Sequence, residues 1–377
     1  PLDKPTLTGR EILYIRQAIA SGKLAGNGGF SARCAAWIEE KTGCRKAFLV
    51  PSGTAALEMM TILARIGPGD EVILPSFTFS STANAVVLRG GVPVFADIRP
   101  DTLNLDEARI EEAVTPRTKA IVPVHYAGVG CEMDPILAIA AKHRLLVLED
   151  AAQGILAAYR GRPLGSIGAM GALSFHETKN VQCGEGGALL VNDPALVERA
   201  ETVMEKGTDR TRFLRGEIDR YTWVDVGSSF LMNEITAAFL FAQLEEAETL
   251  AKERLEAWNA LRAALEPYEE ALSLRVPVVP PECSHNAHLF PVLFDTEEKR
   301  RAAMDALKQA GIQSATHYVP LHSSKAGRAF GRSPKTGLPV TDSVAARLLR
   351  LPVTPGLSDP GRVLDALMPT LGGAKET

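Results

Sequence analysis

Three side chains from separate parts of the sequence offer an amine, an acid and a hydroxyl that could serve one reaction. Lys179 stands in a polar stretch that a Gly-rich turn separates from the next apolar run. Asp150 ends an apolar run, and Thr54 stands where an apolar run gives way to a predicted helix. Each lies at the mouth of a predicted sheet, so the connections of that sheet would have to bring them together.

The surroundings of these residues suit a phosphorylated aldehyde with a basic ring nitrogen. A carboxylate at the C-terminal end of a buried parallel strand lies where open α/β sheets bind their ligands. Ser52-Gly53-Thr54 opens a helix, whose free N–H groups and dipole favour a phosphate. Pyridoxal phosphate needs donors for its phosphate, a carboxylate for its pyridine nitrogen and a lysine for its aldehyde. Taken alone, Lys179 would be a surface lysine and Asp150 a helix cap, so the prediction depends on the whole set.

Several motifs give the chain a resemblance to a known family. SFHETKN, at residues 174–180, is followed by GEGG, and EDAAQG, SGTAAL and PSFTFSSTANA stand upstream. This ordered set resembles the DegT family of pyridoxal-phosphate-dependent sugar aminotransferases, and the resemblance covers residues 5–357. It implies the pyridoxal-phosphate transferase fold of the aspartate aminotransferase type (type I), with pyridoxal 5′-phosphate as the cofactor.

The resemblance assigns most of the cofactor contacts. It implies that Lys179 binds the aldehyde and then acts as general acid and base, and that Asp150 pairs with the protonated pyridine nitrogen. Gln153 would hydrogen-bond the phenolic oxygen O3′ of the cofactor. The phosphate contacts are expected from Gly53, Thr54 and Ser174.

Two further positions concern the face of the cofactor ring and the other subunit. Phe79 aligns with the family aromatic that stacks on the pyridine ring, and Phe77 competes for that role. Ser229 stands where relatives often have an asparagine that reaches the phosphate of the other subunit. The resemblance implies a homodimer with its active sites at the subunit interface, and the serine leaves the detail of the cross-subunit contact open.

An arginine-rich stretch at residues 206–223 allows two interpretations. Arg210, Arg215 and Tyr221 could grip a nucleotide diphosphate and stack its base. They could equally belong to a salt-bridged surface loop, because acidic residues are interspersed among them. The resemblance places His317 and Tyr318 near the sugar pocket. These five residues are the candidate substrate contacts.

The implied reaction is transamination of a nucleotide-linked keto sugar. By resemblance the acceptor is dTDP-4-keto-6-deoxy-D-glucose, the product is dTDP-4-amino-4,6-dideoxy-D-galactose and the amino donor is L-glutamate. Amination at C3, or of another nucleotide sugar such as a GDP-linked one, is the alternative enzyme activity. A binding or regulatory protein that kept the fold without the chemistry is the alternative outside catalysis. The presence of Lys179, Asp150 and Thr54 speaks against it.

The elements that must position these residues alternate between strands and helices. From residue 47 to residue 148, apolar runs of strand length alternate with helix-length segments, which predicts a mainly parallel sheet with both faces covered. A hairpin formed by strands at 172–175 and 188–191 would make the sheet mixed. A long helix at 234–264 is expected to lead from a large α/β domain, residues 1–245, into a small α+β domain, residues 246–377.

From residue 273 onward, the pattern of apolar runs becomes typical of an α+β domain. Strands are expected at 272–276 and 289–294, and helices at 296–310, 343–351 and 360–367. The arginine-rich stretch before the long helix is expected to be irregular.

Composition and charge exclude several functional classes. The formal net charge is −4, which argues against nucleic-acid or anionic-membrane partners bound through bulk electrostatics. The five cysteines include no Cys-x-x-Cys pair, so no metal site is expected. The first residues have no apolar core of a signal peptide, and no apolar run has the length of a membrane span. A cytoplasmic enzyme is therefore expected.

Overall fold

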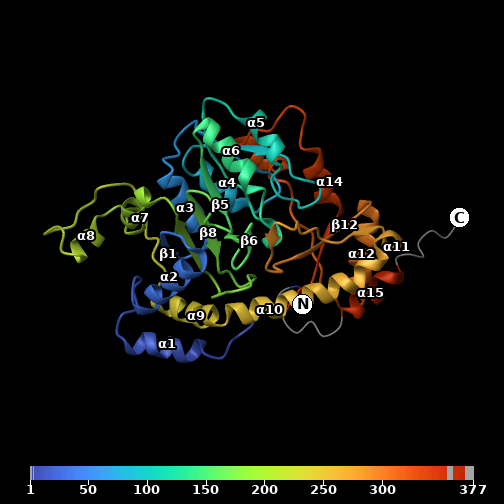
Figure 1. Cartoon of the computed structure of the whole chain (residues 1–377), viewed down its shortest axis with the longest axis horizontal. Helices are drawn as coiled ribbons and strands as arrows, with labels where there is room; N and C mark the ends of the chain where they lie inside the picture. The colour runs from blue at the N-terminus through green and yellow to red at the C-terminus, as the bar shows by residue number, and fades with distance from the viewer. Residues whose placement is uncertain (1, 3, 355–359, 370–377) are drawn as a thin grey trace.

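A seven-stranded mixed sheet forms the centre of the computed structural model, which describes residues 2, 4–354 and 360–369 (Figure 1). The strand order is β1-β9-β8-β5-β4-β2-β3. β9 runs antiparallel to β1 and β8, and the other neighbours are parallel. The strands are β1 (Lys46–Val50), β2 (Glu71–Pro75), β3 (Val92–Ala96), β4 (Thr118–Ile121), β5 (Leu146–Asp150), β8 (Met170–Ser174) and β9 (Gly187–Val191). The predicted α/β fold with a mixed sheet is confirmed.

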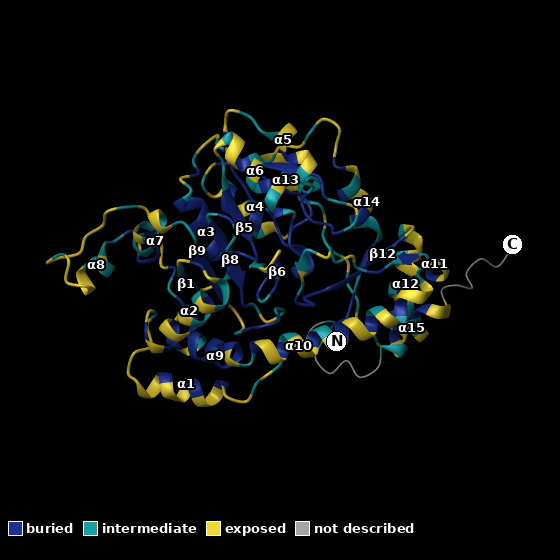
Figure 2. Ribbon diagram, in the orientation of Figure 1, coloured by how far each residue is buried: buried dark blue, intermediate teal, exposed yellow. Residues whose placement is uncertain are grey.

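Helices cover both faces of this sheet. Along β1, Ala47 and Leu49 join the core beneath α2 (Gly29–Thr42) and α9 (Glu234–Glu245), whereas Phe48 joins the core beneath α3 (Gly53–Leu63). This alternation follows from the two-residue period of a strand. Because both faces are covered, the strands are mostly dark blue in Figure 2 and their sequences are largely apolar.

The layers around the large sheet contain further helices and a small second sheet. They are α1 (Glu11–Ala20), α4 (Ser80–Val87), α5 (Ile110–Ala113), α6 (Met133–His143), α7 (Val197–Met204) and α8 (Arg210–Leu214), with the small sheet of β6 (Ala158–Tyr159), β7 (Arg162–Pro163) and β11 (Cys283–Ser284). None of the helices in the described part of the chain combines the length and the apolar character that a membrane crossing requires.

A second, smaller layer follows a break in the predicted long helix. α9 ends at Glu245, Glu246 leaves helical geometry, and α10 (Ala247–Leu265) continues along the base of the molecule in Figure 1. α10 packs with helices on a three-stranded antiparallel sheet around its own apolar core. The strands of this sheet are β10 (Leu274–Arg275), β12 (Phe290–Phe294) and β13 (Leu348–Leu351). The helices that join α10 in this layer are α11 (Glu269–Leu272), α12 (Glu297–Gln309) and α15 (Gly361–Leu367). The division into domains at residues 245 and 246 stays a prediction.

The sequence predictions were wrong in detail at several places. The helix predicted at 343–351 is α14 (Pro339–Arg347) followed by β13, because Leu348 and Leu349 are buried in pairs with β12 and that pairing outweighs local helical periodicity. α14 begins early because a proline suits the first helical turn. The stretch expected to be irregular contains α8. A further short helix, α13 (Lys325–Phe330), was not predicted.

One buried carboxylate of α9 joins that helix to the start of α2. Glu234, at the first turn of α9, accepts hydrogen bonds from the backbone N–H groups of Gly28 (2.9 Å), Phe30 (2.7 Å) and Ser31 (3.1 Å), and from the Ser31 hydroxyl. The first three donors belong to the start of α2, where N–H groups have no partner within the helix. Glu234 therefore caps α2 from a neighbouring helix.

Replacing Glu234 by alanine should lower the free energy of unfolding by roughly 3 kcal/mol, because several buried N–H groups lose a charged acceptor. Thermal unfolding of the cofactor-free protein measures this. Glu253→Ala is the matched control, since Glu253 is exposed on α10 and its loss should cost no more than about 0.5 kcal/mol. Equal stability of the two variants would contradict the capping role.

Candidate active site

One cavity collects most of the residues that the sequence singled out. It has a volume of about 400 Å³ and lies at the C-terminal ends of β1, β5 and β8. The predicted residues that line it are Gly53, Thr54, Phe79, Asp150, Gln153, Ser174, Lys179, His317 and Tyr318. Parallel strands place their carboxyl ends at one edge, which is where open α/β sheets form ligand sites.

Asp150 is fixed at the base of the cavity by two hydrogen bonds. It ends β5 and is 5% exposed. Its Oδ2 accepts from the Thr82 hydroxyl (2.7 Å), and its Oδ1 accepts from the backbone N–H of Ala152 (3.1 Å). Because the Thr82 hydroxyl donates to Asp150, the Thr78 hydroxyl at 3.0 Å must donate to Thr82. These hydrogen bonds fix the orientation of the carboxylate, so that it can face one atom of a bound ring.

The start of α3 forms a small-residue cradle at another side of the cavity. Ser52 caps the helix, because its hydroxyl accepts from the N–H of Ala55 (3.0 Å). The hydroxyls of Thr54 and Ser81 lie 2.8 Å apart. A Cβ atom on Gly53 would lie 2.8 Å from the Cβ of Ser174, so only glycine allows the helix to approach β8 this closely. Hydroxyls and first-turn N–H groups are the donors that a phosphate requires.

Lys179 lies on the connection between β8 and β9. Its backbone N–H donates to the carbonyl of His176 (2.8 Å), which makes a turn. The next residue, Asn180, is buried and binds the carbonyl of Asn286 through Nδ2 (2.7 Å) and the Nδ1 of His288 through Oδ1 (2.9 Å). This anchor to a distant loop positions the lysine at the cavity.

Gln153, Tyr318 and His317 form a further polar part of the cavity lining. Gln153 accepts from the N–H of Ala127 (2.7 Å) and donates to the hydroxyl of Tyr318 (3.1 Å). Tyr318 stacks on His317 with ring centroids 4.1 Å apart and an angle of 11°. Burial raises the pKa of Tyr318 to about 12. The phenol of Tyr318 is therefore uncharged at neutral pH.

The two phenylalanines that competed for the ring-stacking role differ in position. Phe77 is 1% exposed and packs edge-on against Tyr126 and Tyr318, with ring centroids 5.3 and 5.4 Å away. Phe79 lines the cavity and is 62% exposed at the start of α4. Only Phe79 has a free face, so it remains the predicted stacking residue.

Four predicted residues lie outside the cavity. Ser229 is exposed and its backbone bridges to Glu205. Arg210 pairs with Glu205 (3.0 Å), and Arg215 pairs with Glu201 (2.8 Å) and Glu217. Tyr221 packs against Phe213 with ring centroids 5.6 Å apart. In Figure 1 the segment around α8 extends away from the sheet, so within one chain these residues form the salt-bridged loop.

Several residues of the cavity were missed by the sequence analysis. Thr82 lies one helical turn after Thr78 at the start of α4, and this spacing could have suggested a pair of hydroxyls. His288 and Arg350 gave no signal. Arg350 falls in a stretch predicted to be helical, and only the tertiary fold brings it to the cavity.

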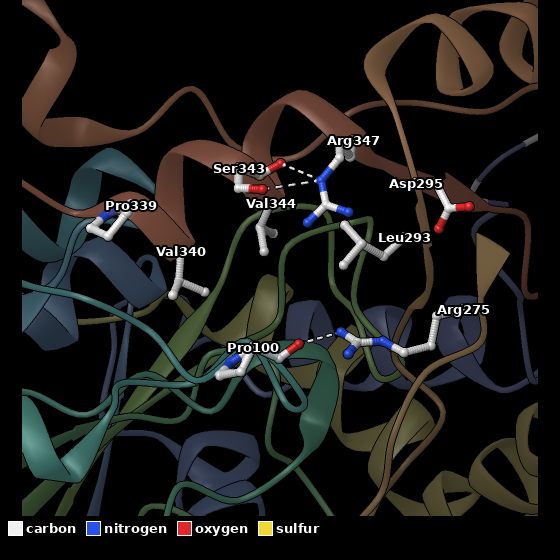
Figure 3. Close-up of a pocket in the computed structure, with 9 residues that line it drawn as sticks. All are labelled: Pro100, Arg275, Leu293, Asp295, Pro339, Val340, Ser343, Val344 and Arg347. Carbon is white, nitrogen blue, oxygen red and sulfur yellow. Dashed lines mark hydrogen bonds between the residues drawn. The ribbon is translucent and has the colours of Figure 1, made fainter. Parts of the chain in front are cut away.

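A second cavity of about 410 Å³ shares no residue with the first (Figure 3). Arg275 and Arg347 lie on its opposite sides among apolar side chains. Arg275 donates to the carbonyl of Pro100, and Arg347 donates to the carbonyls of Phe294 (3.0 Å) and Ser343 (3.1 Å). These arginines join segments of the backbone.

The arrangement in the first cavity agrees with comparisons to known proteins. The model of the DegT/DnrJ/EryC1/StrS aminotransferase family matches residues 5–367. The chain belongs to this family. It is 35% identical over 370 residues to the spore coat polysaccharide biosynthesis protein SpsC of Bacillus subtilis (strain 168), covering 95% of this chain and 93% of SpsC.

Solved structures show the same fold. DesV of S. venezuelae superposes with a TM-score of 0.87 at 32% identity and covers 97% of this chain and 95% of its own. A DegT/DnrJ/EryC1/StrS aminotransferase from Brucella abortus superposes with a TM-score of 0.86 at 30% identity, covering 96% and 95%. The chain is a pyridoxal-phosphate-dependent aminotransferase of the sugar aminotransferase family, which sets aside the binding-protein alternative.

The residues present fit this cofactor. The cradle at Gly53 leaves no room for a side chain beside Ser174 and offers N–H and hydroxyl donors to a phosphate. Asp150 is a fixed carboxylate for a ring nitrogen, and Lys179 is an amine for the aldehyde. When bound, pyridoxal phosphate supplies a protonated, electron-withdrawing ring that makes the α-proton of an amino acid acidic.

Replacing Thr82 by valine should weaken pyridoxal phosphate binding about tenfold, because the Asp150 carboxylate loses its hydroxyl donor. Spectroscopic titration of the cofactor-free protein measures the dissociation constant. Thr61→Val is the control, since Thr61 is another buried threonine that donates to backbone carbonyls away from Asp150. Equal affinity in both variants would contradict the positioning of Asp150 by Thr82.

His317 should stay neutral across the working pH range. Burial and the charges of Arg350 and Lys179 lower its pKa from 6.5 to about 3. His317→Asn should therefore leave the shape of the pH–rate profile between pH 5 and pH 8 unchanged. Because an unfolded histidine binds protons below pH 6.5 and the folded one does not, the wild type should lose stability relative to this variant as the pH falls from about 6.5 toward 3. An inflection near 6.5 that the variant lacks would contradict this assignment.

Proposed function

We propose that the enzyme transfers an amino group from L-glutamate to C4 of dTDP-4-keto-6-deoxy-D-glucose and forms dTDP-4-amino-4,6-dideoxy-D-galactose. The observation that carries the transamination is the convergence of Lys179, Asp150 and the start of α3 on one cavity. The choice of sugar nucleotide rests on the motifs. Amination at C3, or of a GDP-linked sugar, is the alternative, and the cavity favours neither position of the keto group.

Most residues of the cavity would bind the cofactor, and Lys179 would also transfer a proton. Asp150 would keep the ring nitrogen protonated, while Gly53, Thr54 and Ser174 would hold the phosphate. Lys179 would bind the aldehyde in the resting enzyme and, once the donor's amine replaces it, carry a proton from the donor's Cα to C4′ of the cofactor. Tyr318 and His317 would face the sugar ring as neutral hydrogen-bonding groups.

A homodimer would complete the site. Large apolar side chains are exposed beside the cavity and on the segment around α8, including Phe79 (62%), Leu214 (65%) and Trp223 (79%). A second copy would cover them, since solitary proteins rarely leave large apolar patches in water. The partner's segment around α8 could then bring Arg210, Arg215 and Tyr221, with Ser229, to a neighbouring cavity. The cytoplasmic location expected from the sequence stays a prediction.

Incubation with L-glutamate and matched 4-keto and 3-keto nucleotide sugars tests the proposed reaction. The amino sugar should form from the dTDP-linked 4-keto compound, with the new amine at C4 by NMR. Lys179→Ala is the matched control and should give no product, because it removes the amine that carries the proton. Product at C3 alone would overturn the C4 assignment, and product from GDP-linked sugars alone would overturn the choice of nucleotide.

A further inference from the structure

The cavity of Figure 3 brings two arginine side chains from different elements to one space. Arg275 reaches it from β10, and Arg347 reaches it from the end of α14. Leu293 of β12 lies between these elements, because it pairs with Arg275 on one side and with Leu348, the residue after Arg347, on the other. The pairing of the strands therefore fixes where the two guanidinium groups can lie.

Each of these guanidinium groups has donors that the hydrogen bonds to the backbone leave over. A guanidinium carries five N–H donors. Arg275 donates through Nη2 to the carbonyl of Pro100, and Arg347 donates through Nε to Ser343 and through Nη1 to the carbonyl of Phe294. Within the part of the chain that the structure describes, neither arginine has a further hydrogen bond or an ion pair. Both side chains can therefore donate to a ligand in the cavity.

The carboxylates close to these arginines have partners of their own. They are Asp101, which pairs with Arg99 (2.9 Å), Glu269, which accepts from the N–H of Val276 (2.6 Å), and Asp295, which lies 3.8 Å from Lys299. Only Asp295 among them lines the cavity, and its side chain is 67% exposed. The lining thus holds two cations against one solvated carboxylate.

The two arginines repel each other in surroundings that solvate charge poorly. Burial lowers the pKa of Arg275, Asp101 raises it, Arg347 lowers it and Glu269 raises it, and the balance is a lowered pKa. A lowered pKa in an arginine means that its positive charge is less favourable here than in water. An anion placed between the two guanidinium groups would offset this cost.

The remaining walls of the cavity are mostly apolar. Besides the charged residues and Ser343, the lining residues are Pro100, Leu293, Pro339, Val340 and Val344. The volume of about 410 Å³ falls in the range of roughly 300–1,000 Å³ that small-molecule sites occupy. Apolar walls with a few convergent polar groups are typical of such sites. A bare inorganic ion would leave these walls uncovered.

We propose that this cavity is a binding site for a small organic anion. The oxyanion group of the ligand, a phosphate or a carboxylate, lies between Arg275 and Arg347, whose planar groups donate to such oxygens in pairs. The apolar body of the ligand packs on Leu293, Val340 and Val344. This cavity shares no lining residue with the candidate active site, so the anion binds together with the cofactor and not in its place.

Phenyl phosphate is the probe, because it joins an oxyanion to an apolar ring. Its binding is measured by calorimetry on the protein loaded with pyridoxal phosphate, so that the phosphate cradle at α3 is already occupied. Arg275→Gln and Arg347→Gln should each weaken binding about tenfold, since each removes a charge-assisted pair. Asp295→Asn should strengthen it about threefold, because it removes the carboxylate of the lining. Arg16→Gln, which removes an equal charge from an exposed position on α1, should match the wild type.

Three further compounds separate the two parts of the ligand. Benzyl alcohol, which has the ring without the charge, should show no binding. Inorganic phosphate, which has the charge without the ring, should bind about tenfold more weakly than phenyl phosphate. Benzoate compares a carboxylate with a phosphate, and the tighter of benzoate and phenyl phosphate identifies the oxyanion that the site takes. Benzyl alcohol that binds as tightly as phenyl phosphate would overturn the anion site.

The arginine variants also lose hydrogen bonds to the backbone, so their thermal unfolding is measured beside their binding. If either variant fails to fold, Asp295→Asn decides, because Asp295 is exposed and its replacement is expected to leave the fold intact. Affinity for phenyl phosphate that is the same in the wild type, in Asp295→Asn and in the folded arginine variants would place the compound elsewhere on the protein and overturn the site.

Discussion

The register of four neighbouring strands is the constraint on which the active site depends. Gly187 of β9 pairs with Val50 of β1 on one side and with Ser174 of β8 on the other, while Asp150 of β5 pairs with Ala172. These pairings bring the start of α3, the turn that carries Lys179 and the carboxylate of Asp150 to one edge of the sheet. A Cβ atom on Gly187 would lie 2.4 Å from the carbonyl carbon of Ser52. Glycine is therefore required where the phosphate cradle meets the sheet.

Around this edge, polar groups are positioned by other polar groups. Thr78 and Thr82 hold Asp150, Asn180 fixes the lysine turn to the loop at 286–288, and Arg350 donates a hydrogen bond to His317. Such groups can be buried because each has a partner. Fixed dipoles and charges of this kind act on a reaction without having to reorganise during it. The same networks join the large sheet to the C-terminal layer, so the relative placement of the two layers shapes the cavity.

The sequence predicted the parts of this structure that depend on local pattern. Continuous apolar runs marked the buried strands, and motifs marked Lys179, Asp150 and the start of α3. It could not predict contacts that depend on tertiary pairing. Leu348 to Leu351 looked helical and became a strand because β12 offered a partner, and that strand carries Arg350 into the cavity. For the residues around α8, the sequence indicated suitable side chains but could not indicate their position. Arg210, Arg215 and Tyr221 have suitable chemistry, yet a single chain leaves them away from the cavity, and only an assembly could bring them to one.

The central claim is that residue 179, rather than another lysine, meets the cofactor beside Asp150. Reduction of the cofactor-loaded protein with borohydride, followed by digestion and mass spectrometry of the peptides, tests it directly. The account predicts one modified peptide, with the pyridoxyl group on the Lys179 side chain. Modification at a different lysine, or spread over several surface lysines, would contradict the account.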